Sequence, residues 1–173
     1  MEKHIEIELT WSELITGAMV GVMRRVQSLK RAYKGAQKRD LGAPQWQRDI
    51  EGALAELAVH RCLGIYWPCS LDWIRKGKTV AAPDMLEDIH IKGTAHANGR
   101  LIVRPEEDPK EGRYILVIHK NDRVKTIVGW INGADAASPD YLDNPNSAGE
   151  AYFVPQDHLN GFDKMNGHYI CSA

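Results

Sequence analysis

The sequence predicts an α/β (α+β) protein in which helices pack on a central mixed sheet. Two observations lead to this class. In the N-terminal third of the chain, apolar residues recur every three or four positions, which is typical of amphipathic helices. From residue 71 onward, short apolar runs alternate with turn residues, which is typical of strands. Helices followed by a run of strands favour an architecture in which the helices cover a sheet.

The N-terminal segment predicts a strand and a long helix. Residues 4–9 alternate polar and apolar side chains, as a half-buried strand does. Thr10 and Glu13 have capping-box spacing, so we expect a helix over residues 11–34. We expect its outward face to hold most of its basic residues and its apolar positions to face the core. These apolar positions are Leu14, Met19, Val22, Met23, Val26, Leu29 and Tyr33.

A second helix is expected over residues 45–63, and Gly64 fits the position just past its C-terminus. Strands joined by turns follow this helix. Asn98-Gly99 predicts a hairpin between the second and third of them, and Asn121-Asp122 predicts a later turn. Residues 134–150 are rich in turn formers and are expected to form a surface loop. The expected strands cover residues 71–74, 89–92, 101–104, 114–119 and 126–131.

The length of 173 residues suits one domain over residues 1–173. Within it we expect an N-terminal strand and basic helix (1–44), a core (45–132) and an acidic C-terminal segment (133–173). No apolar run approaches the roughly 20 residues of a membrane span, so we expect no membrane partner. Three scattered cysteines indicate a reducing compartment and free thiols. We therefore expect a cytoplasmic protein.

The net charge is −1, but the basic residues are concentrated. Residues 24–48 hold eight basic residues and one acid, and such a stripe can attract a phosphate backbone. The alternative is an ordinary solvated helix face. DNA is the expected partner, and homo-oligomerisation is left open. The candidate nucleic-acid-binding residues are Arg24, Arg25, Lys30, Arg31, Lys34 and Thr94.

The chemistry-bearing segment runs from Asp84 to Thr94. If the strand over residues 89–92 is regular, His90 and Lys92 share one face with Asp88, while the isoleucines between them face the core. A carboxylate before a turn, followed by a polar residue and a lysine two positions apart, suits a divalent cation site. Such a cation and the lysine could together polarise a phosphate.

These residues resemble the PD-(D/E)xK nuclease superfamily, whose core is a helix supplying an acid and a strand pair supplying Asp and (Asp/Glu)-x-Lys. Pro83-Asp84 matches the first strand motif, His90-Ile91-Lys92 occupies the second, and Glu56 lies in the helix segment 51–58. The order of the segments that follow is similar to that of small phage-type members, which implies the host cytoplasm as the location if the chain is phage-encoded. The resemblance extends over roughly residues 50–155.

The resemblance implies a restriction-endonuclease-like core and a metal-dependent nuclease that hydrolyses DNA phosphodiesters with Mg²⁺ or Mn²⁺. It implies Lys92, Asp84 and Glu56 as catalytic residues. The implied metal ligands are Glu56, Asp84, His90 and the backbone carbonyl of Ile91.

One position departs from the family pattern, because His90 stands where the family has Asp or Glu. A neutral imidazole can bind Mn²⁺ but is a poor ligand for Mg²⁺. Three interpretations stay open. His90 is a ligand with a shifted metal preference, Asp88 supplies the missing oxygen, or the protein no longer cleaves and only binds nucleic acid or a protein partner.

Overall fold

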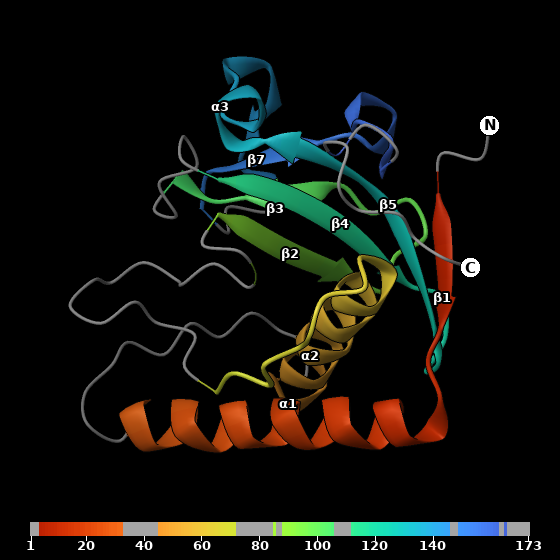
Figure 1. Ribbon diagram of the computed structural model, residues 1–173. Coiled ribbons are helices and arrows are strands. Elements are labelled where there is room, and N and C mark those ends of the chain that lie inside the picture. The colour runs from red at the N-terminus through yellow and green to blue at the C-terminus, as the bar shows by residue number, and fades with distance from the viewer. Residues whose placement is uncertain are drawn as a thin grey trace.

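A computed structural model describes residues 4–32, 45–71, 85, 88–105, 112–145, 149–162 and 165, with the backbone alone for residues 31 and 32. The chain begins with strand β1 (Ile5–Glu8), followed by helices α1 (Trp11–Ala32) and α2 (Gln45–Cys62). All three were predicted. Figure 1 shows α2 lying between the sheet and α1, so that α1 forms the outermost layer.

The start of α1 and the end of α2 follow local sequence signals. Thr10 N donates to Glu13 Oε2 at 2.7 Å, and Glu13 N donates to Thr10 Oγ1 at 3.2 Å, which is the predicted capping box. After α2, Gly64 has a φ of +65°, and Ile65 N donates to His60 O at 2.9 Å. A left-handed residue at this position ends a helix at low cost when it is glycine.

The main sheet has the strand order β1-β5-β4-β2. Its other members are β2 (Ile89–Thr94), β4 (Arg113–His119) and β5 (Val124–Asn132). β2 pairs with β4 in parallel and the other pairs are antiparallel, which confirms the predicted mixed sheet. At the predicted turn between β4 and β5, Asn121 Oδ1 accepts from Arg123 N at 2.9 Å and Val124 N at 2.7 Å.

A second, smaller sheet has the order β3-β7-β6. It contains β3 (Leu101–Val103), β6 (Leu142–Asp143) and β7 (Ala151–Val154). The predicted hairpin is therefore wrong: Gly99 N donates to His96 O in a turn, but β2 and β3 enter different sheets. A turn signal is local, whereas the pairing partner of a strand is decided by the rest of the chain.

The segment 134–150 also contains more structure than the predicted surface loop. A short helix, α3 (Gly133–Ala136), overlaps its start, and a 3-10 helix (Pro139–Tyr141) and β6 follow. Another 3-10 helix (Gln156–His158) comes after β7. These elements are too short for a periodic pattern to reveal them, because a period needs several turns or several alternations.

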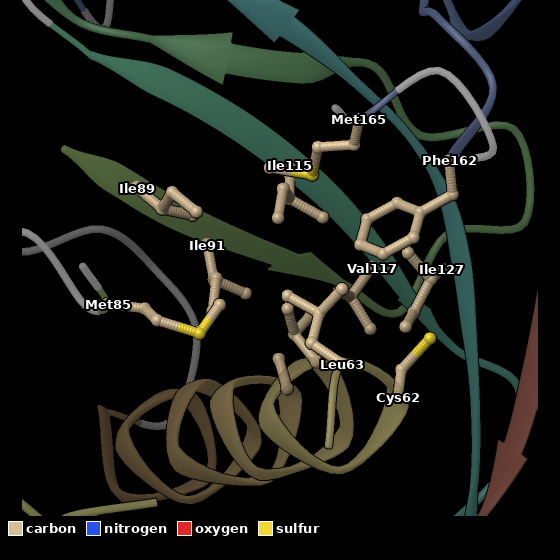
Figure 2. Packing of buried hydrophobic residues seen from close by; sticks show 12 residues of the cluster. Cys62, Leu63, Met85, Ile89, Ile91, Ile115, Val117, Ile127, Phe162 and Met165 are labelled. Carbon is tan, nitrogen blue, oxygen red and sulfur yellow. The ribbon is translucent and has the colours of Figure 1, made fainter. Parts of the chain in front are cut away.

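The two faces of the main sheet bury different cores. Toward α2, Ile89 and Ile91 of β2 pack with Ile115 and Val117 of β4 (Figure 2), and Ala55 and Val59 of α2 lie in the same cluster. On the opposite face, Tyr114 and Leu116 of β4 pack with side chains of the second sheet. Alternation along each strand therefore separates its residues into these two layers. The second core comprises Leu101, Val103, Tyr114, Leu116, Ile118, Val128, Ile131, Ala136, Val154 and Leu159.

The face of α1 that meets α2 differs from the expected one. Gly17, Val20 and Gly21 are buried, and the Arg24 and Arg25 side chains are half-buried. A Cβ on Gly21 would lie 2.6 Å from Ile50 N, which shows how closely the two helices approach. Most of the basic side chains of α1 were expected to face outward, and Arg24 and Arg25 do not. Four of the apolar positions assigned to the core, Met19, Val22, Met23 and Val26, are exposed instead.

Two predicted elements extend beyond the described residues, and the expectation for the cysteines is wrong in part. The predicted strand 71–74 lies outside them beyond Leu71, as does the end of the first predicted helix at residues 33–34. Cys69 is a free thiol, but Cys62 is disulfide-bonded, so the expectation of free thiols is wrong for Cys62. Among the described helices, none combines the length and the apolar character needed to cross a bilayer.

Candidate functional site

Strand β2 presents His90 and Lys92 on one face of the sheet, as the alternation predicted, and this face points away from α2. His90 is paired in register with Tyr114 of β4, and the two rings stack with centroids 4.9 Å apart and an interplanar angle of 16°. Lys92 Nζ lies 5.8 Å from the centroid of the same tyrosine ring. His90 is buried and Lys92 is half-buried, so the pair lies at the margin of the second core.

The chain turns back on itself immediately before β2. Met85 N donates to Ile89 O at 3.2 Å, and Ile89 N donates to Met85 O at 3.0 Å. This reciprocal bridge holds Met85 against the first residue of β2. Asp84, the residue that precedes Met85 in the sequence, lies outside the described residues, as does Pro83.

Glu56 is buried in α2 with its carboxylate in contact with cationic and polar donors. Arg24 of α1 reaches it with both terminal nitrogens, one to Oε1 and the other to Oε2 at 2.7 Å. Trp67 Nε1 lies 3.4 Å from Glu56 Oε2. Arg24 also donates to the backbone carbonyl of Ser70 through Nε and a terminal nitrogen. The predicted catalytic acid is therefore one half of a two-point ion pair between the helices.

The structure does not bring Glu56 together with His90 and Lys92. Ala55, its neighbour in α2, packs against the sheet face that carries Ile91, whereas His90 and Lys92 occupy the opposite face. Within the described ranges, no group of three or more His, Cys, Asp or Glu side chains could hold a metal ion. The described donors therefore do not fit a preformed metal site.

The alternative oxygen donor, Asp88, is also engaged. Arg113 Nε donates to Asp88 Oδ2 at 2.8 Å, and a terminal nitrogen donates to Oδ1 at 3.1 Å. This fork arrangement uses both carboxylate oxygens. At the other end of β2, Thr94 Oγ1 accepts from His96 N at 3.2 Å, so it helps to shape the turn that follows.

The basic residues proposed for DNA binding differ in how far the structure presents them to a phosphate. Arg24 is committed to Glu56 and Ser70, and the Nε atom of Arg25 is buried with no hydrogen-bond partner. Lys30 is exposed near the C-terminal end of α1. The side chain of Arg31 and all of Lys34 lie outside the described residues. A phosphate backbone could reach Lys30 directly, whereas Arg24 is not presented to solvent in the way a phosphate contact requires.

A buried histidine was not singled out from the sequence. His119, at the end of β4, is 8% exposed and neither ring nitrogen has a hydrogen-bond partner. A Cβ on Gly93 would lie 2.6 Å from its Nε2, so the ring occupies the space that this glycine leaves. Burial, and then the charge of Lys125, lower the pKa of His119 to about 4. In the sequence, His119 follows Ile115 and Val117 at steps of two residues, which indicates that it shares their buried face of the strand.

Lys125 of β5 is the cation beside this histidine and is 1% exposed. Its Nζ donates to the backbone carbonyls of Asn121 and Asp122, each at 2.9 Å, so the buried charge is solvated by the turn. Burial lowers the pKa of Lys125, against the charges of Glu51 and Asp122. His119 and Lys125 are paired in register across β4 and β5, which explains why the charge of Lys125 lowers the pKa of His119.

A search among protein-family models, curated proteins and solved structures finds no match to this chain.

Proposed function

We propose that the chain is a metal-dependent nuclease that hydrolyses DNA phosphodiesters. The observation that carries the proposal is the arrangement of β2. His90 and Lys92 are presented two residues apart on one face, and the start of the strand is bridged to Met85, the residue after Asp84. This is the local order that the PD-(D/E)xK resemblance requires around its second motif.

Lys92 is the residue to which the proposal assigns a definite role. Its ammonium group would offset the negative charge that accumulates on a phosphate during hydrolysis. The aromatic face of Tyr114, 5.8 Å away, limits where the ammonium can lie. The proposal keeps Mg²⁺ or Mn²⁺ as the cofactor to be tested and assigns no step to it, because the described donors do not form a metal site.

The Arg24–Glu56 pair favours a second candidate: a nuclease-like protein that no longer cleaves and only binds nucleic acid or a protein partner. A carboxylate with both oxygens bonded to a guanidinium is poorly placed to bind a cation. Histidine in the position of the family's acid points in the same direction. The two candidates make opposite predictions about cleavage, and they agree on DNA binding only if the partner of the second candidate is nucleic acid.

The test is to incubate the protein with plasmid and single-stranded DNA in Mg²⁺ and, separately, in Mn²⁺. If the enzyme proposal holds, Lys92→Ala and Asp84→Ala should each lower the rate by roughly 10²-fold or more. Lys120→Ala is the matched control, because Lys120 is an exposed lysine that pairs with Glu6 at 2.7 Å. Its cleavage rate should equal that of the wild type.

The remaining outcomes separate the two candidates. No cleavage in either metal, together with DNA binding that weakens as salt rises, supports the non-cleaving protein. Cleavage that survives in both Lys92→Ala and Asp84→Ala contradicts the site assignment. A protein that neither cleaves nor binds DNA at low salt contradicts a role in nucleic-acid chemistry.

A further inference from the structure

Helix α1 has two apolar faces, and the fold uses one of them. The face toward α2 carries Gly17, Val20 and Gly21, which are all buried. A Cβ on Gly17 would lie 2.5 Å from Leu54 Cδ2, so small residues set the distance between the helices. Because this face is narrow and closely packed, it leaves the larger apolar side chains of α1 on the outside.

The second face is an apolar stripe along the solvent side of α1. Its side chains are between 37% and 66% exposed, although each is large and apolar. Figure 1 shows α1 at the edge of the molecule, with α2 on one side of it. Monomeric proteins rarely expose a continuous apolar patch of more than a few hundred Å². The apolar stripe consists of Trp11, Ile15, Met19, Val22, Met23 and Val26.

The spacing of the stripe is that of a helix–helix seam. Ile15, Met19, Val22 and Val26 follow one another at steps of four, three and four residues, and the half-buried Leu29 adds a step of three. This alternation has the 3.5-residue period that lets one helix stay in contact with another along its length. An isolated helix in water gains nothing from such a period. The spacing therefore suits another helix as the occupant.

We propose that this helix is α1 of a second copy of the chain, paired antiparallel through the apolar stripe. A two-fold axis between residues 20 and 21 would place Met19 against Val22 and Ile15 against Val26. It would also bring the stem of Lys30 next to Trp11, whose ring already has Arg123 Cζ of its own chain 4.6 Å from its centroid and is 66% exposed. Ile15, Met19, Val22 and Val26 then each meet an apolar partner, so this part of the surface is self-complementary as a two-fold interface requires.

Charge selects the antiparallel direction. All four basic residues of α1 lie at or after Arg24, and its one acid is Glu13 in the first turn. Parallel pairing would place the two basic halves side by side. Antiparallel pairing separates the two Lys30 residues by about 28 Å along the axis, at about 1.5 Å per residue, which exceeds the Debye length at physiological salt.

The size of the surface sets the strength of the dimer. From Trp11 to Val26 the stripe extends for roughly 22 Å along the helix. Two such helices bury several hundred Å² on each copy, which is below the roughly 800 Å² per partner of a standard interface. We therefore expect a reversible dimer with a micromolar dissociation constant.

Sedimentation velocity of the full chain over a range from about 1 to 100 µM tests the proposal against that expected affinity. The wild type should pass from the mass of one chain to that of two. Met19→Glu/Val22→Glu places charges opposite one another across the axis and should raise the dissociation constant at least about tenfold. Tyr66→Glu is the control, since Tyr66 is 84% exposed and outside the stripe. Circular dichroism should show equal helix content in all three.

Cross-linking tests the direction of pairing. Mixed Ile15→Cys and Val26→Cys proteins should form a disulfide between them on mild oxidation, and neither should cross-link efficiently to itself. Wild type treated in the same way provides the background from the native cysteines. Self-cross-linking of Ile15→Cys would overturn the antiparallel arrangement. A wild type that stays monomeric over the whole range, or a dimer unaffected by the stripe substitutions, would overturn the proposal itself.

Discussion

At the scale of single residues, the structure buries an ion pair between the helices and a histidine in the sheet. Arg24 and Glu56 satisfy each other across the α1–α2 interface, with side chains only 12% and 8% exposed. His119 is buried with no partner for either nitrogen, so it can be accommodated only in the neutral form. The burial of Arg24 and Glu56 is tolerated because the two charges are paired. The burial of His119 is tolerated because its ring is uncharged.

Replacement of Arg24 by Met should destabilise the protein by about 3–5 kcal/mol, because it leaves the Glu56 carboxylate buried and unpaired. Replacing both residues, in Arg24→Met/Glu56→Met, should recover much of that loss. Urea unfolding monitored by circular dichroism measures both changes. For comparison, Lys120→Met removes the exposed pair with Glu6 and should cost no more than about 1 kcal/mol. Equal losses for Arg24→Met and Lys120→Met would contradict the inferred importance of burial.

His119 predicts a pH dependence of stability. Its pKa falls from 6.5 to about 4 on folding, so between these values the unfolded chain binds the proton more strongly. Stability is therefore complete above pH 6.5 and decreases as the pH falls toward 4, by at most about 1.4 kcal/mol per pH unit. In His119→Leu this contribution disappears. Unfolding curves collected from pH 4 to 7 should show a wild-type-to-variant difference that changes with pH, and a constant difference would contradict the assignment.

At the scale of elements, α1 shows that an apolar period can predict a helix correctly while the face that the helix buries is predicted wrongly. The period predicted the helix and the capping box predicted its start, and both are confirmed. The buried face was misjudged because glycine has no side chain to register as apolar. Gly17 and Gly21 allow the backbone of α1 to approach α2, which buries main-chain and Cα surface in place of large side chains.

The glycines of the two helices give a matched pair of substitutions. In Gly21→Ala the new Cβ would lie 2.6 Å from Ile50 N and 2.7 Å from Asp49 O, and backbone atoms cannot yield without moving α2. We expect a loss of about 1–3 kcal/mol, as for overpacking. In Gly52→Ala the Cβ meets nothing within 4 Å, so the gain in helix propensity should add roughly 0.5–1 kcal/mol. Chemical unfolding measures both, and opposite signs are the expected result.

At the scale of the whole molecule, four layers follow one another: α1, α2, the main sheet and the second sheet (Figure 1). α2 packs against α1 on one side and the main sheet on the other, which is why its residues from 53 to 60 are all buried. The same layering separates the site residues. Glu56 belongs to the interface between the helices, and His90 and Lys92 belong to the interface between the sheets.

The sequence by itself determined the order of the main elements, the start of α1, the end of α2, the alternation of β2 and the mixed character of the sheet. These follow from local periodicity and capping, which depend on neighbours in the chain. Only the tertiary structure decided that β2 pairs with β4 and β3 with β7, that Arg24 forms an ion pair with Glu56, and that α1 turns its large apolar side chains outward. These features depend on which surfaces far apart in the sequence fit together. Such a fit produces no periodic pattern in the sequence.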